Sequence, residues 1–106
     1  MKRVILESPY AGNVEAHVRY ARECIRDCLL RGEAPIASHL LYTQEGILQD
    51  RAPEERSLGI NAGLVWSEVA ELAVVYTDFG ISRGMEEGIT RHRQNGVPVE
   101  FRALRE

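Results

Sequence analysis

The sequence predicts a small α/β domain, a three-layer sandwich built on a mostly parallel sheet of four strands. Short apolar runs alternate with longer segments of helical periodicity, in the order strand, helix, strand, helix, strand, helix, strand. Strands that alternate with helices in this way require right-handed crossovers, and such crossovers produce a parallel sheet. The chain has 106 residues, which suffices for one domain and not for two. We therefore assign residues 1–106 to a single domain.

The first strand and the first helix have the clearest patterns. Residues 4–6 form an apolar run that stops at the turn-rich segment 8–12. Asn13 can cap the helix that follows, because its side-chain oxygen can accept hydrogen bonds from the first backbone amides. Apolar residues then recur on one helical stripe over residues 14–29, and Gly32 is expected to end this helix.

The middle of the chain carries weaker signals. Residues 34–37 are expected to form a second strand that runs on to Ser38 and His39, and residues 40–52 a loop or a broken helical segment. Pro53 suits the first position of a second helix, which should end near residue 70. The residues expected to point inward from this helix are Leu58, Ala62, Val65 and Val69.

The last third of the chain predicts two strands and the helix between them. Residues 72–76 are apolar throughout, which is typical of a strand covered on both faces. Ser82 can cap a third helix that continues to about Asn95. Residues 97–101 are expected to form the fourth strand.

Composition and charge argue against several classes of function. The net charge is −3 and charges of both signs are scattered, whereas a protein that binds a nucleic-acid polymer would show a basic face. No apolar run approaches the roughly 18 residues that a membrane span requires. The apolar part of the N-terminus is too short for a secretory signal, so we expect a cytoplasmic protein. We expect Cys24 and Cys28 to be buried thiols rather than metal ligands, because His17, on the same helical stripe, lies about 10 Å from Cys24 along the helix axis.

Ligands of parallel sheets bind beyond the carboxyl ends of the strands, which here are followed by residues 8–13, 38–42 and 77–87. In the first and third segments, small residues precede a helix N-terminus whose free amides favour an anion such as phosphate. A plain strand-to-helix turn explains the first segment equally well. Arg83 can pair with a phosphate or be a solvated residue of the first turn. Glu86 can point back toward a ligand or be a surface acid, and Glu87 is expected to face solvent.

In three features the sequence resembles members of the nucleoside 2-deoxyribosyltransferase superfamily. This superfamily includes the 2-deoxynucleoside 5-monophosphate N-hydrolases. The three features are Ala11-Gly12 after the first strand, Gly84-Met85-Glu86-Glu87-Gly88 after the third, and His39. The resemblance implies a Rossmann-like fold and cleavage or transfer of the N-glycosidic bond of a (deoxy)nucleoside or its 5-monophosphate, with Glu86 as the nucleophile. It implies no metal and no organic cofactor.

The resemblance also implies roles for other residues. Tyr10 would orient Glu86, and Asp78 or His39 would give a proton to the departing base. A phosphate cradle would comprise Gly12, Asn13, Ser82, Arg83 and Gly84. Members of the superfamily often complete their sites from a neighbouring subunit, so a homodimer or higher homo-oligomer is expected, with Leu64 and Trp66 as candidate interface residues.

Two departures from the family pattern support a second hypothesis. A gap-free match places the catalytic tyrosine of the family at Pro9, one position before Tyr10. Asn61 stands nearest to where the family carries an aspartate, and an amide cannot carry a proton as a carboxylate does. The alternative function is therefore a non-catalytic module that binds a nucleotide or a nucleotide-derived signal of the ADP-ribose type.

Overall fold

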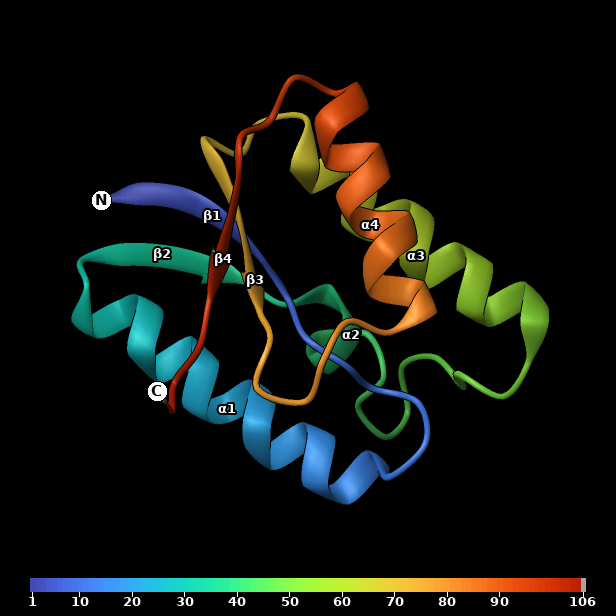
Figure 1. Cartoon of the computed structure of the whole chain (residues 1–106). Helices are drawn as coiled ribbons and strands as arrows, with labels where there is room; N and C mark the ends of the chain where they lie inside the picture. The colour runs from blue at the N-terminus through green and yellow to red at the C-terminus, as the bar shows by residue number, and fades with distance from the viewer. Residues whose placement is uncertain (106) are drawn as a thin grey trace.

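A computed structural model describes residues 1–105 and shows a four-stranded, all-parallel sheet (Figure 1). The strand order is β2-β1-β3-β4. The strands are β1 (Lys2–Glu7), β2 (Glu33–Ile36), β3 (Leu72–Tyr76) and β4 (Val99–Arg102). From β1 the chain continues to one side of the sheet, and from β3 it continues to the other. The predicted α/β class and parallel sheet are confirmed.

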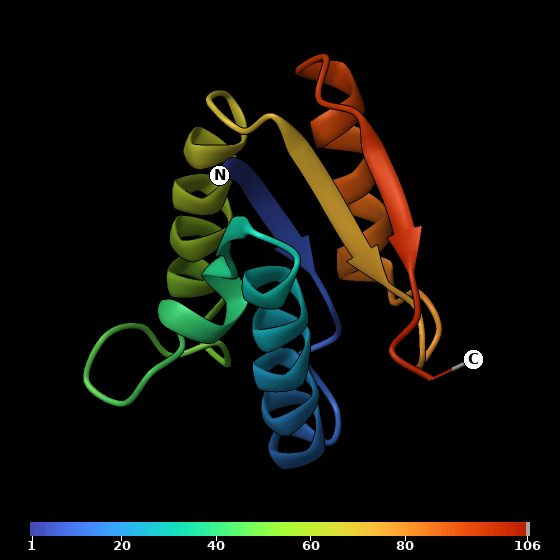
Figure 2. The ribbon, with the colours of Figure 1, turned by 90° about the vertical axis from the view of Figure 1, so that its left-hand side faces the viewer.

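Helices cover both faces of the sheet (Figure 2). They are α1 (Val14–Leu30), α2 (Ser38–Leu41), α3 (Pro53–Ser67) and α4 (Arg83–Gln94). The side chains of a strand alternate between its two faces, so Val4 and Leu6 pack with Cys24 and Cys28 of α1, while Ile5 faces the opposite side. None of the helices within residues 1–105 has the length and apolarity that crossing a membrane requires.

The two predicted helix caps are present. The side-chain oxygen of Asn13 accepts a hydrogen bond from the backbone amide of Ala16 at 3.2 Å. The hydroxyl of Ser82 accepts one from the amide of Met85, also at 3.2 Å. Because each cap satisfies an amide that has no partner within its helix, these residues determine where α1 and α4 begin.

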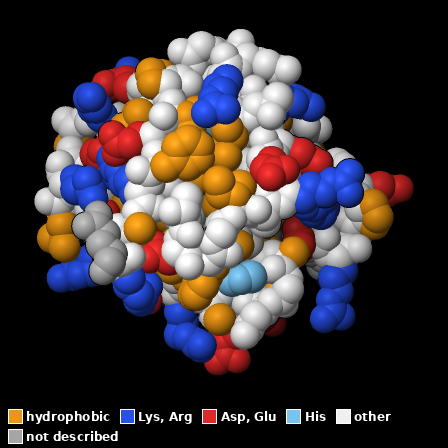
Figure 3. Space-filling model, in the orientation of Figure 1, with side chains coloured by type: hydrophobic (Ala, Val, Ile, Leu, Met, Phe, Trp, Pro, Cys, Tyr) orange, Lys and Arg blue, Asp and Glu red, His pale blue; other side chains and the backbone are white. Residues whose placement is uncertain are grey.

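On the face shown in Figure 3, acidic and basic side chains lie interspersed around a central group of hydrophobic ones.

The segment after β2 differs from the sequence-based expectation. Ser38 and His39 do not extend the strand but begin α2. The pairing of β1 with β2 ends at Ile36, although β1 itself continues to Glu7. The amides of Leu40 and Leu41 instead bond to the carbonyl of Ala37, both at 3.0 Å, which closes a helical turn.

The orientation of α3 also differs from the prediction. Leu58, Val65 and Val69 were expected to point inward, but they are 59%, 61% and 53% exposed. The buried residues of α3 are Gly63 and Ser67. A side chain at residue 63 would place its Cβ only 2.4 Å from the Ser38 hydroxyl, so the small-residue side of α3 is the one that packs on α2.

Trp66 of α3 is half-exposed and donates a hydrogen bond from Nε1 to the hydroxyl of Tyr42 at 3.1 Å. This contact joins α3 to the residue that follows α2. The interface role of Trp66 and Leu64 stays a prediction.

A buried ion pair joins the two edge strands. Arg102 of β4 donates from both terminal nitrogens to the two carboxylate oxygens of Glu33 at the start of β2, at 2.7 and 2.6 Å. Both residues are buried. These hydrogen bonds lower the pKa of Glu33, against the effect of burial, which raises it. Because a lone charge in this position would lack compensation, each partner depends on the other.

Replacing one partner should therefore destabilise the fold. Arg102→Met leaves the Glu33 carboxylate buried without its cation, and we expect the free energy of unfolding to fall by about 3–5 kcal/mol in urea titrations followed by circular dichroism. The matched control is Arg105→Met, because Arg105 pairs with Glu23 on the exposed surface and should contribute less than about 1 kcal/mol. Equal effects of the two substitutions would contradict this account.

Candidate functional site

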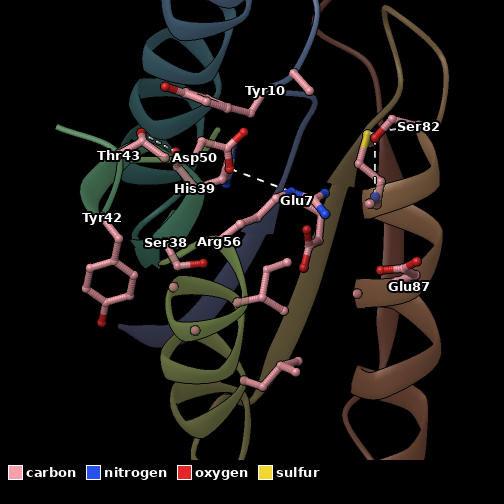
Figure 4. A pocket seen from close by; sticks show the side chains of 18 of the residues that line it. Glu7, Tyr10, Ser38, His39, Tyr42, Thr43, Asp50, Arg56, Ser82 and Glu87 are labelled. Atoms are coloured by element: carbon pink, nitrogen blue, oxygen red, sulfur yellow. Dashed lines mark hydrogen bonds and ion pairs between the residues drawn. The ribbon is translucent and has the colours of Figure 1, made fainter. Parts of the chain in front are cut away.

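A cavity of about 340 Å³ lies between α3 and α4, next to the carboxyl end of β1 (Figure 4). Its wall includes Ile5 and Glu7 of β1, and α2 and the segment after it contribute residues on one side. The strands that leave in opposite directions, β1 and β3, are neighbours in the sheet. In sheets of this type, ligands bind at that point of divergence.

Glu7 occupies the last position of β1 and lies between α3 and α4 (Figure 4). Its Oε2 is 2.6 Å from Nε2 of His92 on α4, and the Nδ1 of that ring is 2.7 Å from the hydroxyl of Ser67 on α3. Ser67 and His92 are fully buried. One chain of hydrogen bonds therefore connects β1, α4 and α3 at the cavity.

The α2 side of the cavity carries His39 and Ser8, with His39 Nε2 at 2.7 Å from the Ser8 hydroxyl. Burial lowers the pKa of His39, and the negative charge of Glu7 opposes that shift without reversing it. The imidazole is therefore mainly neutral at pH 7, which suits a hydrogen-bonding group better than a proton donor. Within residues 1–105, no group of three His, Cys, Asp or Glu side chains could hold a metal ion.

The outer part of the cavity is rich in charge. Arg56 on α3 pairs with Asp50 at 3.7 Å, and Arg83 on α4 pairs with Glu87 at 3.8 Å. A Cβ at Gly84 would lie 3.7 Å from a terminal nitrogen of Arg56, so this arginine reaches across to the start of α4. Two guanidinium groups and a helix N-terminus thus border the same opening, where an anion would compete with Asp50 and Glu87 for the arginines.

The structure brings together half of the residues that the sequence singled out. Those that line the cavity are Tyr10, His39, Ser82, Arg83 and Gly84. Those that lie outside it are Gly12, Asn13, Asn61, Asp78 and Glu86.

Local structure accounts for three of these outside positions. Gly12 accepts a hydrogen bond from the amide of Val14 in the turn before α1. The side-chain oxygen of Asn13 is used by its cap. Asn61 is exposed on α3.

Glu86 does not reach the cavity as expected, whereas Glu87, which faces solvent as expected, also borders the cavity. Met85 and Ile89 are buried on the sheet side of α4, and this determines the rotation of the helix. Successive residues of a helix are about 100° apart, so a change of one position decides which glutamate reaches the cavity. Both side chains are exposed, but only Glu87 lines the cavity. The nucleophile that the resemblance implies is therefore not in the cavity.

Asp78 has a structural environment. Its Oδ1 accepts hydrogen bonds from the Tyr20 hydroxyl at 2.6 Å and the Leu104 amide at 2.9 Å, and its Oδ2 accepts one from the Arg105 amide at 2.8 Å. Burial would raise the pKa of Asp78, but these hydrogen bonds together lower it. The carboxylate is therefore ionised at neutral pH and holds no proton for a departing base.

Sequence reasoning missed Glu7, His92 and Arg56. A signal for Glu7 exists: it is the charged residue that ends a buried apolar strand, at the end of the sheet where ligands bind. A second signal is the spacing of Gly88 and His92, which places them on one face of α4. Nothing in the sequence relates Glu7 to His92, because 85 positions separate them.

The lowered pKa of His39 predicts a pH effect on stability. Below about pH 6.5, the unfolded chain binds a proton at this ring more readily than the folded protein does. The free energy of unfolding should therefore fall as the pH drops from 7 to 5, and His39→Gln should make this dependence shallower in urea titrations. The carboxylates with lowered pKa values, such as Glu33 and Asp78, lose their contribution mainly below about pH 5. Identical slopes for the two proteins would contradict the prediction.

Comparison with known proteins agrees with this architecture. A solved structure of 2-deoxyribosyltransferase from the psychrotolerant bacterium Bacillus psychrosaccharolyticus is similar, with a TM-score of 0.65 and 17% sequence identity over 95% of this chain and 72% of that one. At that identity the likeness concerns the fold. No curated protein matches the sequence. Residues 2–102 match the family described as a domain of unknown function, DUF7768, and the chain belongs to that family.

Proposed function

We propose that the cavity binds a nucleoside or a nucleoside 5-monophosphate and that one of its glutamates cleaves or transfers the N-glycosidic bond. One observation carries this proposal: a single cavity holds a carboxylate, Glu7, near the sheet and two arginines with a helix N-terminus at its opening. These are the groups that an oxocarbenium-like sugar and a phosphate need. The similar fold of a 2-deoxyribosyltransferase supports the proposal.

The lining suggests how such a ligand would lie. The phosphate would meet Arg83 and the first amides of α4, which Ser82 caps. Ile60 and Leu64 of α3 offer apolar surface to a base, and Tyr10 offers an aromatic ring. The sugar would then lie between these two ends, nearest to the strand.

The proposed reaction has two steps, formation of a glycosyl ester and its breakdown. A carboxylate oxygen bonds to the anomeric carbon while the bond from that carbon to the base nitrogen breaks. The electron pair leaves with the base, which takes up a proton from water. Water or a second base then attacks the same carbon, and the carboxylate is released. His39 would orient the base by hydrogen bonding. It would not act as the acid, because its lowered pKa leaves little of the protonated ring at neutral pH.

A specific observation favours a second function. Glu86 lies outside the cavity and Asn61 is exposed, so neither occupies the position that the resemblance assigns to a catalytic residue. The same cavity could hold a nucleotide or an ADP-ribose-type signal without turnover. In that case the arginines would serve binding alone.

The test measures free base released from a panel of deoxynucleosides and their 5-monophosphates by liquid chromatography. We expect release, and we expect Arg83→Ala to raise KM about tenfold for the monophosphates but not for the nucleosides, because a charged hydrogen bond to phosphate is lost. The matched control is Arg93→Ala, an exposed arginine of α4 outside the cavity.

Two other outcomes would redirect the proposal. Thermal stabilisation by a nucleotide without any release of base would select the binding module. If the panel produced neither stabilisation nor free base, both functions would be wrong.

A further inference from the structure

We infer that Glu7 is the nucleophile of this cavity, in the role that the resemblance assigns to Glu86. The inference rests on the proposed function. Glu7 ends β1 on the side of the sheet that faces α3 and α4, as Ile5 does, and its side chain is 18% exposed. It lines the cavity, whereas Glu86 does not.

The other acids of the cavity already have partners near its opening. Asp50 pairs with Arg56, Glu87 pairs with Arg83, and Glu55 accepts a hydrogen bond from the backbone amide of Gln49 at 3.2 Å. Glu7 differs from them. Its Oε2 contacts His92, and its Oε1 has no hydrogen-bond partner among residues 1–105. One oxygen is held and the other remains available to a ligand.

His92 and Ser67 orient this carboxylate. Nδ1 of His92 lies 2.7 Å from the Ser67 hydroxyl and Nε2 lies 2.6 Å from Oε2 of Glu7, so both ring nitrogens of this buried imidazole have a hydrogen-bond partner. A buried imidazole between two fixed partners restricts the rotation of the Glu7 side chain. His92 is therefore a positioning residue, and Glu7 is the one expected to touch the sugar.

Gly88 makes room for Glu7. A Cβ at residue 88 would lie 2.6 Å from Oε2 and 2.9 Å from Cδ of Glu7, closer than real side chains approach. Glycine inside a helix costs about 1 kcal/mol relative to alanine, so it is unfavourable on local grounds. Its presence in α4 is explained by the carboxylate that fills the space beside it.

In the reaction, Oε1 of Glu7 bonds to the anomeric carbon as the bond to the base nitrogen breaks. The departing nitrogen keeps the electron pair and takes a proton from water. Attack by water on the same carbon then breaks the ester bond, regenerates the carboxylate and leaves a proton in solution. The hydrogen bond from His92 to Oε2 persists throughout and stabilises the returning charge.

The decisive experiment compares base release by Glu7→Gln, Glu86→Gln and the unchanged protein on the same deoxynucleotide panel. We expect Glu7→Gln to lower kcat roughly 10³-fold, because an amide is not a nucleophile. The control is Glu68→Gln, an exposed residue outside the cavity, which should keep the parent rate. Thermal melting of each variant shows whether it is folded.

A covalent readout identifies the residue directly. A 2-fluoro-substituted nucleoside destabilises the oxocarbenium-like transition state and slows release of the sugar, so the glycosyl ester should accumulate. Peptide mapping by mass spectrometry should then find the adduct on Glu7.

Two further variants test the orientation of Glu7. Gly88→Ala should also abolish base release, although alanine favours the helix, because it displaces the Glu7 carboxylate. Ser67→Ala should lower kcat with little change in KM, which a merely structural role would not produce.

The outcomes separate the two proposals. If the unchanged protein releases base and Glu7→Gln does so equally fast, or if the adduct maps to Glu86 or Glu87, the assignment of Glu7 is wrong while the proposed function stands. If the unchanged protein releases no base and forms no adduct, the glycosidic function is wrong and the assignment falls with it.

Discussion

A carboxylate at the end of a buried strand determines much of the structure around it. Glu7 leaves the core pointing toward α3 and α4, where an uncompensated charge would be costly. His92 hydrogen-bonds to this carboxylate, and Ser67 hydrogen-bonds to the other ring nitrogen of His92. For these contacts to form, α4 must pass so close to β1 that only glycine fits at residue 88. The shape of the cavity, the rotation of α4 and the packing of α3 thus all depend on the hydrogen bonding of the Glu7 carboxylate.

The charged groups on the two faces of the sheet have different roles. On the side of α1, the charged groups serve the fold: Arg102 and Glu33 join the edge strands, and Asp78 holds the C-terminal segment. Each of these carboxylates has its hydrogen bonds satisfied by the protein. On the other side, Glu7 keeps one oxygen without a partner among residues 1–105. An acid that the fold does not use fully is the one available for chemistry.

The relation of this chain to a 2-deoxyribosyltransferase concerns architecture, because 17% identity shows a common fold. Members of one fold class carry unrelated activities, so function has to be argued from the site. Here the cavity lies at the expected edge of the sheet, but Glu86 of the first turn of α4 does not line it, whereas Glu7 of β1 does. A reaction proposed for this chain has to be built on that difference.

The sequence alone determined the alternation of strands and long helices, the parallel sheet, the buried strand Leu72–Tyr76 and the caps at Asn13 and Ser82, but not the short helix α2. These features arise from interactions between residues a few positions apart, which periodicity and capping chemistry express directly. Only the tertiary structure decided which side of α3 is buried, since that helix is apolar on more than one face, and whether Glu86 or Glu87 reaches the cavity. Both depend on contacts between distant segments, and no local pattern encodes them.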